Sequence, residues 1–273
     1  MKSVLFDKDD LAKISTLFRG KFGRVLTTIV MSALALNRIN RVFAKVCHLR
    51  GGEFTAAWLK ELNVTYSIEN HSALDRLPDG AFVTVSNHPF GFMDGIILMN
   101  MIIPKRPDYK FMVNSLLLSL YPLNDNLIGV KPTTTRSGST IENGTGLKLT
   151  FRHLANGRSM GFFPAGAVSN YNENRWKVTD REWQPTVIRL IEKANVPVVP
   201  IYISGKNSIF FHFLGRINWQ LRSVRLPYEI LNKHKQQIRI VVGDPISVEE
   251  LKKYNNTKEL ADYLRAKTYA LGN

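Results

Sequence analysis

Residues 81–103 read AFVTVSNHPFGFMDGIILMNMII, and the rest of the chain can be organised around them. The first five residues are apolar and alternating, which predicts a buried strand. Gly95 to Ile103 is a second apolar run, long enough for a buried helix. The turn between the two runs holds His88 and Asp94, together with a proline and a glycine that bend the backbone. The stretch therefore predicts a strand, a sharp turn and a helix.

A histidine and an aspartate six residues apart do not share a face of one helix. If His88 lies in the turn and Asp94 in the first helical turn, the chain folds back and the carboxylate meets the imidazole. A carboxylate on one ring nitrogen fixes the tautomer and leaves the other nitrogen free as a general base. Two plainer interpretations stay open at this point, a structural histidine and an aspartate that only caps the helix.

Charge is the unusual feature of the composition. The 273 residues contain 37 Lys and Arg against 22 Asp and Glu, a net charge of +15, which predicts an anionic partner. Cys47 is the only cysteine, so an intrachain disulfide and a cysteine-rich zinc site are excluded, and we expect no metal. Residues 1–10 lack the pattern of a secretory signal, and no window reaches the roughly 18 apolar residues of a spanning helix.

The N-terminal region predicts an amphipathic helical arm. In residues 11–49 apolar side chains recur every three or four positions, with Arg19, Lys21 and Arg24 between them. Residues 25–36 are weakly polar and too short to span a bilayer, but they suit a helix lying among anionic headgroups. The alternative is a helical hairpin packed on its own domain. We predict a membrane-associating arm at 1–50 and one α/β domain at 51–273.

Short apolar strands alternate with helices through the remaining chain. This pattern predicts an α/β fold with a mostly buried mixed sheet flanked by helices. Residues 205–213 mix polar side chains with phenylalanines, and we assign no helix or strand to them. Ser247 with Glu250 three residues later forms a capping-box pattern at the start of a terminal helix.

Residues 87–94, NHPFGFMD, resemble the NHxxxxD motif of the PlsC-like glycerolipid acyltransferases, with five residues instead of four between the histidine and the aspartate. FPAG at 163–166 resembles the FPxG block of that family, LIGVK at 127–131 its second block, and VVP at 198–200 its later strand and proline. The order and spacing agree across about residues 80–205. The resemblance implies the glycerolphosphate-acyltransferase type of α/β fold.

The sequence is most similar to one branch of that family, the hemolysin-type acyltransferases. FPAG in place of FPEG, then Asp180 and Trp183, then residues 199–208 carry this likeness. The branch includes bacterial O-acyltransferases that complete ornithine and glycine aminolipids.

The resemblance implies the chemistry of acyl transfer. His88 would be the general base, Asp94 would orient it, and no cofactor would be needed beyond an acyl donor, acyl carrier protein or acyl-CoA. A hydroxyl is a weak nucleophile until a base removes its proton. Backbone N–H groups of the loop Phe163, Pro164, Ala165 and Gly166 are candidate donors to the thioester oxygen. Asn87 is assigned to substrate binding.

Departures from the family pattern bear on the acceptor. Glycerol-phosphate users carry a glutamate and arginines where this chain has Ala165, Val168 and Lys131, and lysine only partly replaces a bidentate guanidinium. We therefore predict an N-(3-hydroxyacyl) amino acid as the lipid acceptor, with Lys131 and Lys206 at its carboxylate. Solvated lysines are the simpler alternative for both residues. The alternative function is a 1-acyl-glycerol-3-phosphate (lysophospholipid) acyltransferase.

Nucleic acid is not the expected anionic partner. The basic residues gather in the amphipathic arm, and the sequence holds no helix-turn-helix, RNA-binding aromatic motif or zinc pattern. We expect a peripheral protein at the anionic surface of the cytoplasmic side of the inner membrane.

Overall fold

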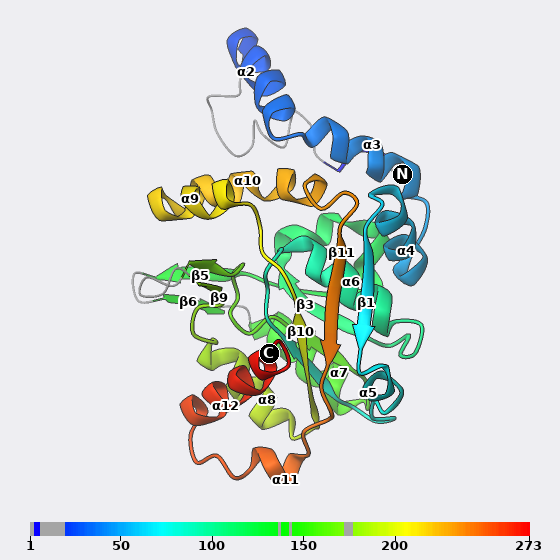
Figure 1. Ribbon diagram of the computed structural model, residues 1–273, viewed down its shortest axis with the longest axis vertical. Helices are drawn as coiled ribbons and strands as arrows, with labels where there is room; N and C mark the ends of the chain where they lie inside the picture. Colours follow the sequence, from blue (N-terminus) through cyan, green and yellow to red (C-terminus); the bar gives the residue numbers. More distant parts are fainter. Residues whose placement is uncertain (1–2, 6–19, 136–137, 142–143, 172–176) are drawn as a thin grey trace.

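A seven-stranded sheet organises the computed structural model, which describes residues 3–5, 20–135, 138–141, 144–171 and 177–273 (Figure 1). Its order is β1 (Thr65–Glu69), β11 (Gln237–Val242), β10 (Val198–Ile203), β2 (Val83–Ser86), β7 (Met160–Phe162), β3 (Lys110–Asn114), β4 (Leu127–Val130). Neighbouring strands run parallel except where β10 meets β11. The predicted α/β fold with a mixed sheet is confirmed.

Helices cover both faces of the sheet, because successive strand residues point to opposite sides. In β10, Val199 and Ile201 belong to one buried cluster and Val198 to the other. The first cluster includes side chains of α3 (Leu36–Val46), α4 (Gly51–Glu61) and α6 (Phe92–Ile102). The second includes side chains of α7 (Gly144–Ala155), α8 (Pro185–Ala194) and α12 (Thr257–Ala270). The sheet therefore lies between two helical layers.

The predicted arm contains α2 (Gly20–Ala33) and α3, and residues 6–19 lie outside the described parts. α3 buries Leu36, Ile39, Phe43 and Val46 in the same core as the residues after 50. The second half of the arm is thus packed as part of the α/β body, and the boundary at residue 50 stays a prediction. Across the described residues, no helix has both the length and the apolarity that a bilayer crossing requires.

Two regions differ from the sequence-based expectation. The chain from 209 to 231 forms α9 (Ile209–Ile217) and α10 (Trp219–Leu231), where no element was predicted. Ser247 does accept the Glu250 N–H, but it caps only the short α11 (Val248–Leu251), and the terminal helix begins separately after Asn256. The remaining elements are α5 (His71–Asp75), η2 (Ser115–Ser119), η3 (Tyr121–Asn126), β5 (Pro132–Thr135), β6 (Gly138–Ile141), β8 (Asn170–Tyr171) and β9 (Val178–Thr179).

His212 on α9 should make folding stability depend on pH. Burial, followed by the charge of Arg222, lowers the pKa of this fully buried imidazole to about 4. An unfolded chain binds a proton here near pH 6.5, so the folded state loses stability as pH falls from 6.5 towards 4. We expect a loss of about 3 kcal/mol from this group across that window.

Urea unfolding at pH 7, 6, 5 and 4.5 measures this effect. His212→Gln should flatten the dependence, because glutamine does not titrate, whatever its effect on stability at pH 7. Parallel pH curves for the wild type and the variant would show that His212 is not the cause.

Candidate active site

The loops after β2, β7 and β10 meet at one edge of the sheet, because these strands are parallel and their carboxyl ends lie together. His88 follows the end of β2 by two residues, and Phe163 directly follows β7. Groups that lie far apart in the sequence therefore gather around the turn at His88.

Two residues fix the shape of this turn. The buried Asn87 amide donates to Ile203 O at 2.8 Å and accepts the Ile203 N–H at 2.7 Å, so it extends the pairing of β2 with β10. Gly91 has φ +85°, a conformation that L side chains rarely adopt, and a Cβ there would press on Val168 and Leu226. The turn therefore needs both an amide at 87 and a glycine at 91.

Asp94 reaches back from the first turn of α6 to the histidine. Its Oδ2 lies 2.9 Å from His88 Nδ1 and also accepts the Phe90 and Gly91 N–H groups, each at 2.9 Å. The carboxylate is fully buried, whereas 16% of the His88 side chain is exposed. Burial raises the pKa of Asp94, and the imidazole and the two N–H donors oppose that rise. The predicted contact is present, and Asp94 both caps the helix and holds the ring.

Aromatic rings hold the other face of the imidazole. The His88 ring stacks on Phe163 with centroids 3.9 Å apart, and Phe163 stacks on Phe111 at 4.8 Å. Phe163 directly follows β7 and Phe111 lies in β3, so neighbouring strands of the sheet place both rings. With Asp94 on one nitrogen and Phe163 against its plane, the imidazole has little freedom to turn.

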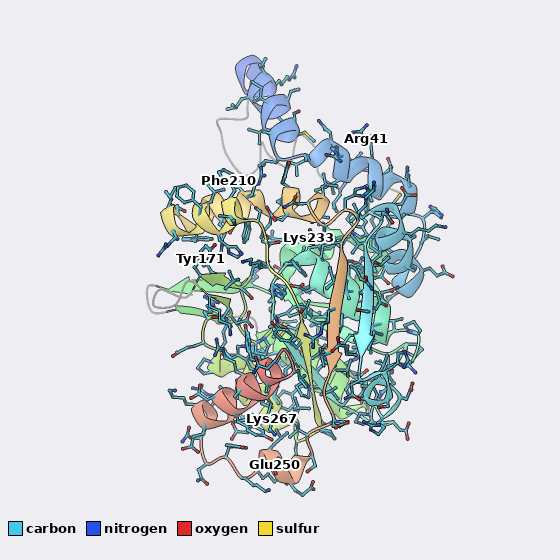
Figure 2. The ribbon with its side chains drawn as sticks, in the orientation of Figure 1. Arg41, Tyr171, Phe210, Lys233, Glu250 and Lys267 are labelled. Carbon is cyan, nitrogen blue, oxygen red and sulfur yellow. The ribbon has the colours of Figure 1, made fainter. Side chains whose placement is uncertain are left out.

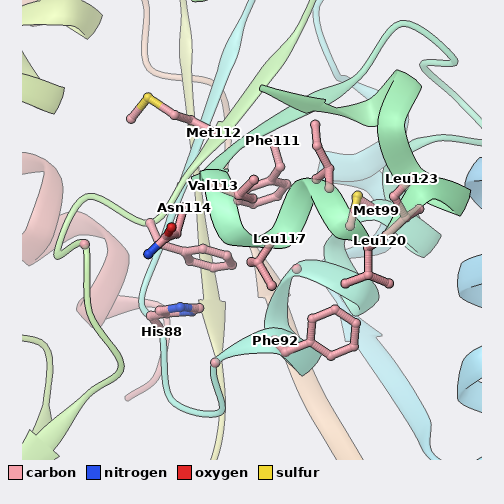
Figure 3. A pocket seen from close by; sticks show the side chains of 15 residues that line it. His88, Phe92, Met99, Phe111, Met112, Val113, Asn114, Leu117, Leu120 and Leu123 are labelled. Atoms are coloured by element: carbon pink, nitrogen blue, oxygen red, sulfur yellow. The ribbon is translucent and has the colours of Figure 1, made fainter. Parts of the chain in front are cut away.

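An apolar cavity of about 200 Å³ opens beside His88 (Figure 3). His88 and Asn114 lie on one side of it, and Leu120 and Leu123 lie on the opposite side. Its other lining residues are mainly apolar and come from α6, β3, the 3-10 segments and the loop after β7. The site thus offers a basic nitrogen next to a space that favours hydrocarbon.

A family model described as "Acyltransferase" matches residues 12–273 of the chain. The chain belongs to this acyltransferase family. The resemblance drawn from NHxxxxD and FPAG is confirmed at the level of the superfamily and its aminolipid branch by the relatives that follow.

Two curated relatives are both named lyso-glycine lipid O-acyltransferase. The protein from Phocaeicola vulgatus is 26% identical over 230 residues, covering 81% of this chain and 78% of the relative. The protein from Bacteroides thetaiotaomicron is also 26% identical over 230 residues, covering 81% and 80%. Among solved structures, the 1-acyl-sn-glycerophosphate (LPA) acyltransferase PlsC from Thermotoga maritima is similar with TM-score 0.51 and 17% identity, covering 97% of this chain and 93% of that one. That likeness shows a shared fold.

Two residues of the FPAG block of this acyltransferase line the apolar cavity, and the other two do not. Phe163 and Gly166 line the apolar cavity, whereas Pro164 and Ala165 are buried behind it. The Gly166 N–H donates to Phe163 O at 2.9 Å, and Pro164 has no N–H. The predicted role in binding the thioester oxygen therefore narrows to the Phe163 and Ala165 N–H groups, and it stays a prediction.

Three residues assigned to substrate binding do not line the apolar cavity. The two polar groups of the Asn87 amide are engaged by Ile203, so this residue positions the turn. Lys131 and Lys206 are exposed and do not line the cavity beside His88. The placement of both lysines at the acceptor carboxylate is therefore not supported, and the simpler alternative of solvated side chains describes them.

Asp180 is a positioning residue that the motif pattern did not assign to the site. It is buried, and its Oδ1 accepts the His88 backbone N–H at 3.1 Å and the Ser169 hydroxyl at 2.6 Å. Its Oδ2 accepts from Trp183 at 3.2 Å. Asp180 and Trp183 appeared in the sequence only as features of the branch, and the structure shows that they hold the turn from behind.

A buried ion pair ties α10 to the same turn. Lys233 Nζ lies 3.6 Å from Glu229, which also accepts the Ser208 N–H and hydroxyl at 3.0 and 2.6 Å. Lys233 Nζ stands 4.7 Å from the Phe90 ring centre. The helical pair α9–α10 is thereby anchored beside His88.

The described residues form neither a serine-nucleophile site nor a metal site. Gly157 to Gly161 reads GRSMG, but Ser159 precedes β7, is fully buried and donates to Asp108 Oδ2 at 2.9 Å, so it is not an exposed nucleophile at a strand end. Within the described parts of the chain, no group of three or more His, Cys, Asp or Glu side chains is arranged to hold a metal ion.

Proposed function

We propose that this acyltransferase moves a fatty acyl group from an acyl thioester to the hydroxyl of an N-(3-hydroxyacyl) amino acid, which makes a diacylated aminolipid of the glycine- or ornithine-lipid type. The observation that carries the proposal is the His88–Asp94 pair at the edge of an apolar cavity. The lyso-glycine lipid O-acyltransferases, which align with 81% of the chain, support the choice of acceptor.

In this mechanism His88 is the general base. With Nδ1 facing Asp94, Nε2 takes the proton of the acceptor hydroxyl as its oxygen attacks the thioester carbonyl. The C–O bond forms, the C–S bond breaks, and the departing sulfur takes the proton from the imidazolium. The Asp94 carboxylate stabilises the imidazolium between these two steps.

The same site accounts for how the acyl donor and its hydrocarbon chain would bind. The apolar cavity would hold an acyl chain next to the imidazole, in a dry environment that strengthens the polar contacts at the thioester. The donor would be acyl carrier protein or acyl-CoA, with no further cofactor. A net charge of +15 suits an acidic carrier protein.

An exposed apolar surface supports attachment to a membrane. We define the apolar end of the molecule by eight exposed side chains on α2, α9 and α10: Val25, Ile29, Ile209, Phe210, Phe213, Ile217, Trp219 and Val224. Phe210 on α9 and Arg41 on α3 lie at this same end (Figure 2). Exposed apolar side chains concentrated on a few helices are typical of membrane or partner contact surfaces.

The charge around this end suits an anionic bilayer. α2, α3 and α9 contain no acidic residue, and Arg24, Arg38, Arg41 and Arg216 are exposed on them. Apolar side chains enter the interface while arginines contact lipid phosphates. We place the protein at the cytoplasmic side of the inner membrane, with the apolar end against the lipid.

The triple variant Phe210→Ser, Phe213→Ser, Ile217→Ser should bind vesicles of 30% anionic lipid at least about tenfold more weakly, because three exposed apolar side chains no longer enter the interface. Sedimentation with vesicles at low and high salt measures this. The control is Leu149→Ser, which removes a half-exposed apolar side chain from α7. Equal binding by the triple variant and the wild type would contradict the assignment of this surface.

Acceptor competition tests the proposed function. The purified enzyme should acylate N-(3-hydroxyacyl)glycine or N-(3-hydroxyacyl)ornithine in preference to lysophosphatidate, with acyl carrier protein and coenzyme A donors supplied in parallel. Turnover of lysophosphatidate alone would contradict the proposed acceptor and favour the phospholipid alternative.

A further inference from the structure

A second hollow of about 570 Å³ lies on the other side of the loop that carries the FPAG block. Three arginines line it, and each comes from a different part of the chain: Arg181 follows β9, Arg222 is on α10 and Arg265 is on α12. The apolar cavity includes none of them, and among the three only Arg222 belongs to the residues that resemble the aminolipid branch. Three guanidiniums in one hollow are typical of carboxylate or phosphate recognition.

The hollow is next to the catalytic turn. Gly166 lines the apolar cavity, and the residue that follows it, Ala167, lines the hollow. Asp180 also lines the hollow while its carboxylate holds the His88 N–H at 3.1 Å. A substrate group bound in the hollow is therefore separated from the imidazole by one loop.

For Arg222 and Arg265 the described residues supply fewer acceptors than the guanidiniums have donors. Arg222 Nη1 and Arg265 Nε are buried, and no acceptor among the described residues bonds to them. Arg265 does donate to the Asp180 carbonyl at 2.8 Å, which fixes its place at the wall of the hollow. Within the described residues, neither Arg222 nor Arg265 forms an ion pair with a carboxylate.

The positive charges also repel one another. Burial, followed by the positive charge of Arg181, lowers the pKa of Arg222, which shows that the two guanidiniums are close enough to interact. An anion between like charges would relieve this repulsion. Buried guanidinium donors without a protein acceptor, as in Arg222 and Arg265, are more typical of ligand sites than of structural packing.

Among the described residues, the acidic side chains of the hollow form no ion pair with Arg222 or Arg265. The Asp180 carboxylate faces the His88 turn and accepts from three donors there. Asp262 forms an ion pair with Lys258 at 2.8 Å. Glu182 is exposed at the rim.

We propose that Arg181, Arg222 and Arg265 bind the negatively charged group of a substrate, a carboxylate or a phosphate, and so position that substrate at His88. The inference rests on the proposed function for the identity of the substrate. An N-(3-hydroxyacyl) amino acid carries its carboxylate roughly 7 Å from its hydroxyl, whereas the phosphate of a pantetheine donor lies more than about 15 Å from the thioester. The short span of the acceptor fits a hollow just behind the loop, in the role first assigned to Lys131 and Lys206.

Steady-state kinetics of the full chain test the site. Arg222→Gln and Arg265→Gln should each raise KM for N-(3-hydroxyacyl)glycine about tenfold to a hundredfold, the effect of a lost charge-assisted hydrogen bond. Arg222→Lys keeps the charge but not the fork, and it should fall between Arg222→Gln and the wild type. Arg189→Gln removes the same charge from the exposed face of α8 and should leave KM unchanged.

The KM values of the two substrates show whether the bound anion is the acceptor carboxylate or the donor phosphate. A rise in the KM of the acceptor alone assigns the site to its carboxylate, and a rise in the KM of the thioester donor alone assigns it to the donor phosphate. Unchanged KM values for both substrates in folded Arg222→Gln and Arg265→Gln would overturn the proposal.

Direct binding measurements test the anion site without requiring turnover. Calorimetry with N-octanoylglycine, its neutral amide and coenzyme A should show that the wild type binds at least one anionic probe more tightly than the amide, and that Arg222→Gln loses this preference. If wild-type enzyme fails to acylate the hydroxylated acceptor yet still shows this preference, the proposed function fails and the anion site stands. Equal affinities of the wild type and Arg222→Gln for every probe would overturn the site.

Discussion

His88→Ala should lower kcat by about a thousandfold or more, with a small change in KM. A general base contributes about 10²- to 10⁴-fold, and here it acts on a hydroxyl that is almost fully protonated at neutral pH. Because the proton moves only in the transition state, its loss should appear in kcat more than in binding. Initial rates over a range of acceptor concentrations measure the two constants separately.

The controls for His88→Ala address folding and the specificity of the site. His71 forms a similar histidine–aspartate contact with Asp75, at 3.6 Å, but this pair is exposed on α5, so His71→Ala should retain full activity. Removal of the His88 ring also removes its stacking on Phe163, so the melting temperature should be recorded together with activity. Substantial turnover by folded His88→Ala would contradict the mechanism.

Asp94→Asn should lower kcat by about a hundredfold, somewhat less than the loss of His88. Asparagine fills the same buried space, but it is neutral and does not stabilise an imidazolium as a carboxylate does. The Phe90 and Gly91 N–H groups still find an oxygen, so the turn should keep its shape. KM should change little, because the carboxylate acts through His88 and not on the substrate.

Asp94→Ala separates catalysis from structure at the same position. It leaves the Phe90 and Gly91 N–H groups without their buried acceptor, which we expect to cost about 1–3 kcal/mol of stability in addition to the catalytic loss. Asp94→Asn should show the catalytic loss with little of the stability loss. Wild-type activity in a folded Asp94→Asn protein would show that the carboxylate serves only as a helix cap.

The core of the site could be predicted from sequence because its parts are local. An apolar strand, a turn with proline and glycine and a helix that follows at once leave few ways to arrange His88 and Asp94. The short separation of the two residues lets backbone geometry alone bring them together. The FPAG block was placed beside them by resemblance, and the parallel pairing of β2 with β7 supplies the physical reason.

Other assignments depend on tertiary contacts, which a local sequence pattern does not specify. Lys131 and Lys206 were chosen for their charge, but whether a lysine faces a cavity or solvent depends on how its loop packs. Asn87 was assigned to substrate binding as part of the family motif, and only the position of β10 shows that Ile203 bonds to its amide. In residues 209–231 the exposed face is itself apolar, so the usual polar and apolar alternation of a surface helix is missing.

The sequence by itself determined the α/β fold class, the acyltransferase family and the pairing of His88 with Asp94, because each rests on local periodicity or a short motif. Only the tertiary structure decided what surrounds that pair. Arg181, Arg222 and Arg265 are distant in the sequence and share a hollow because β9, α10 and α12 converge behind one loop. The local sequence around a charged residue is the same whether its side chain faces solvent or a substrate. Only the packing of distant elements decides which of the two it faces.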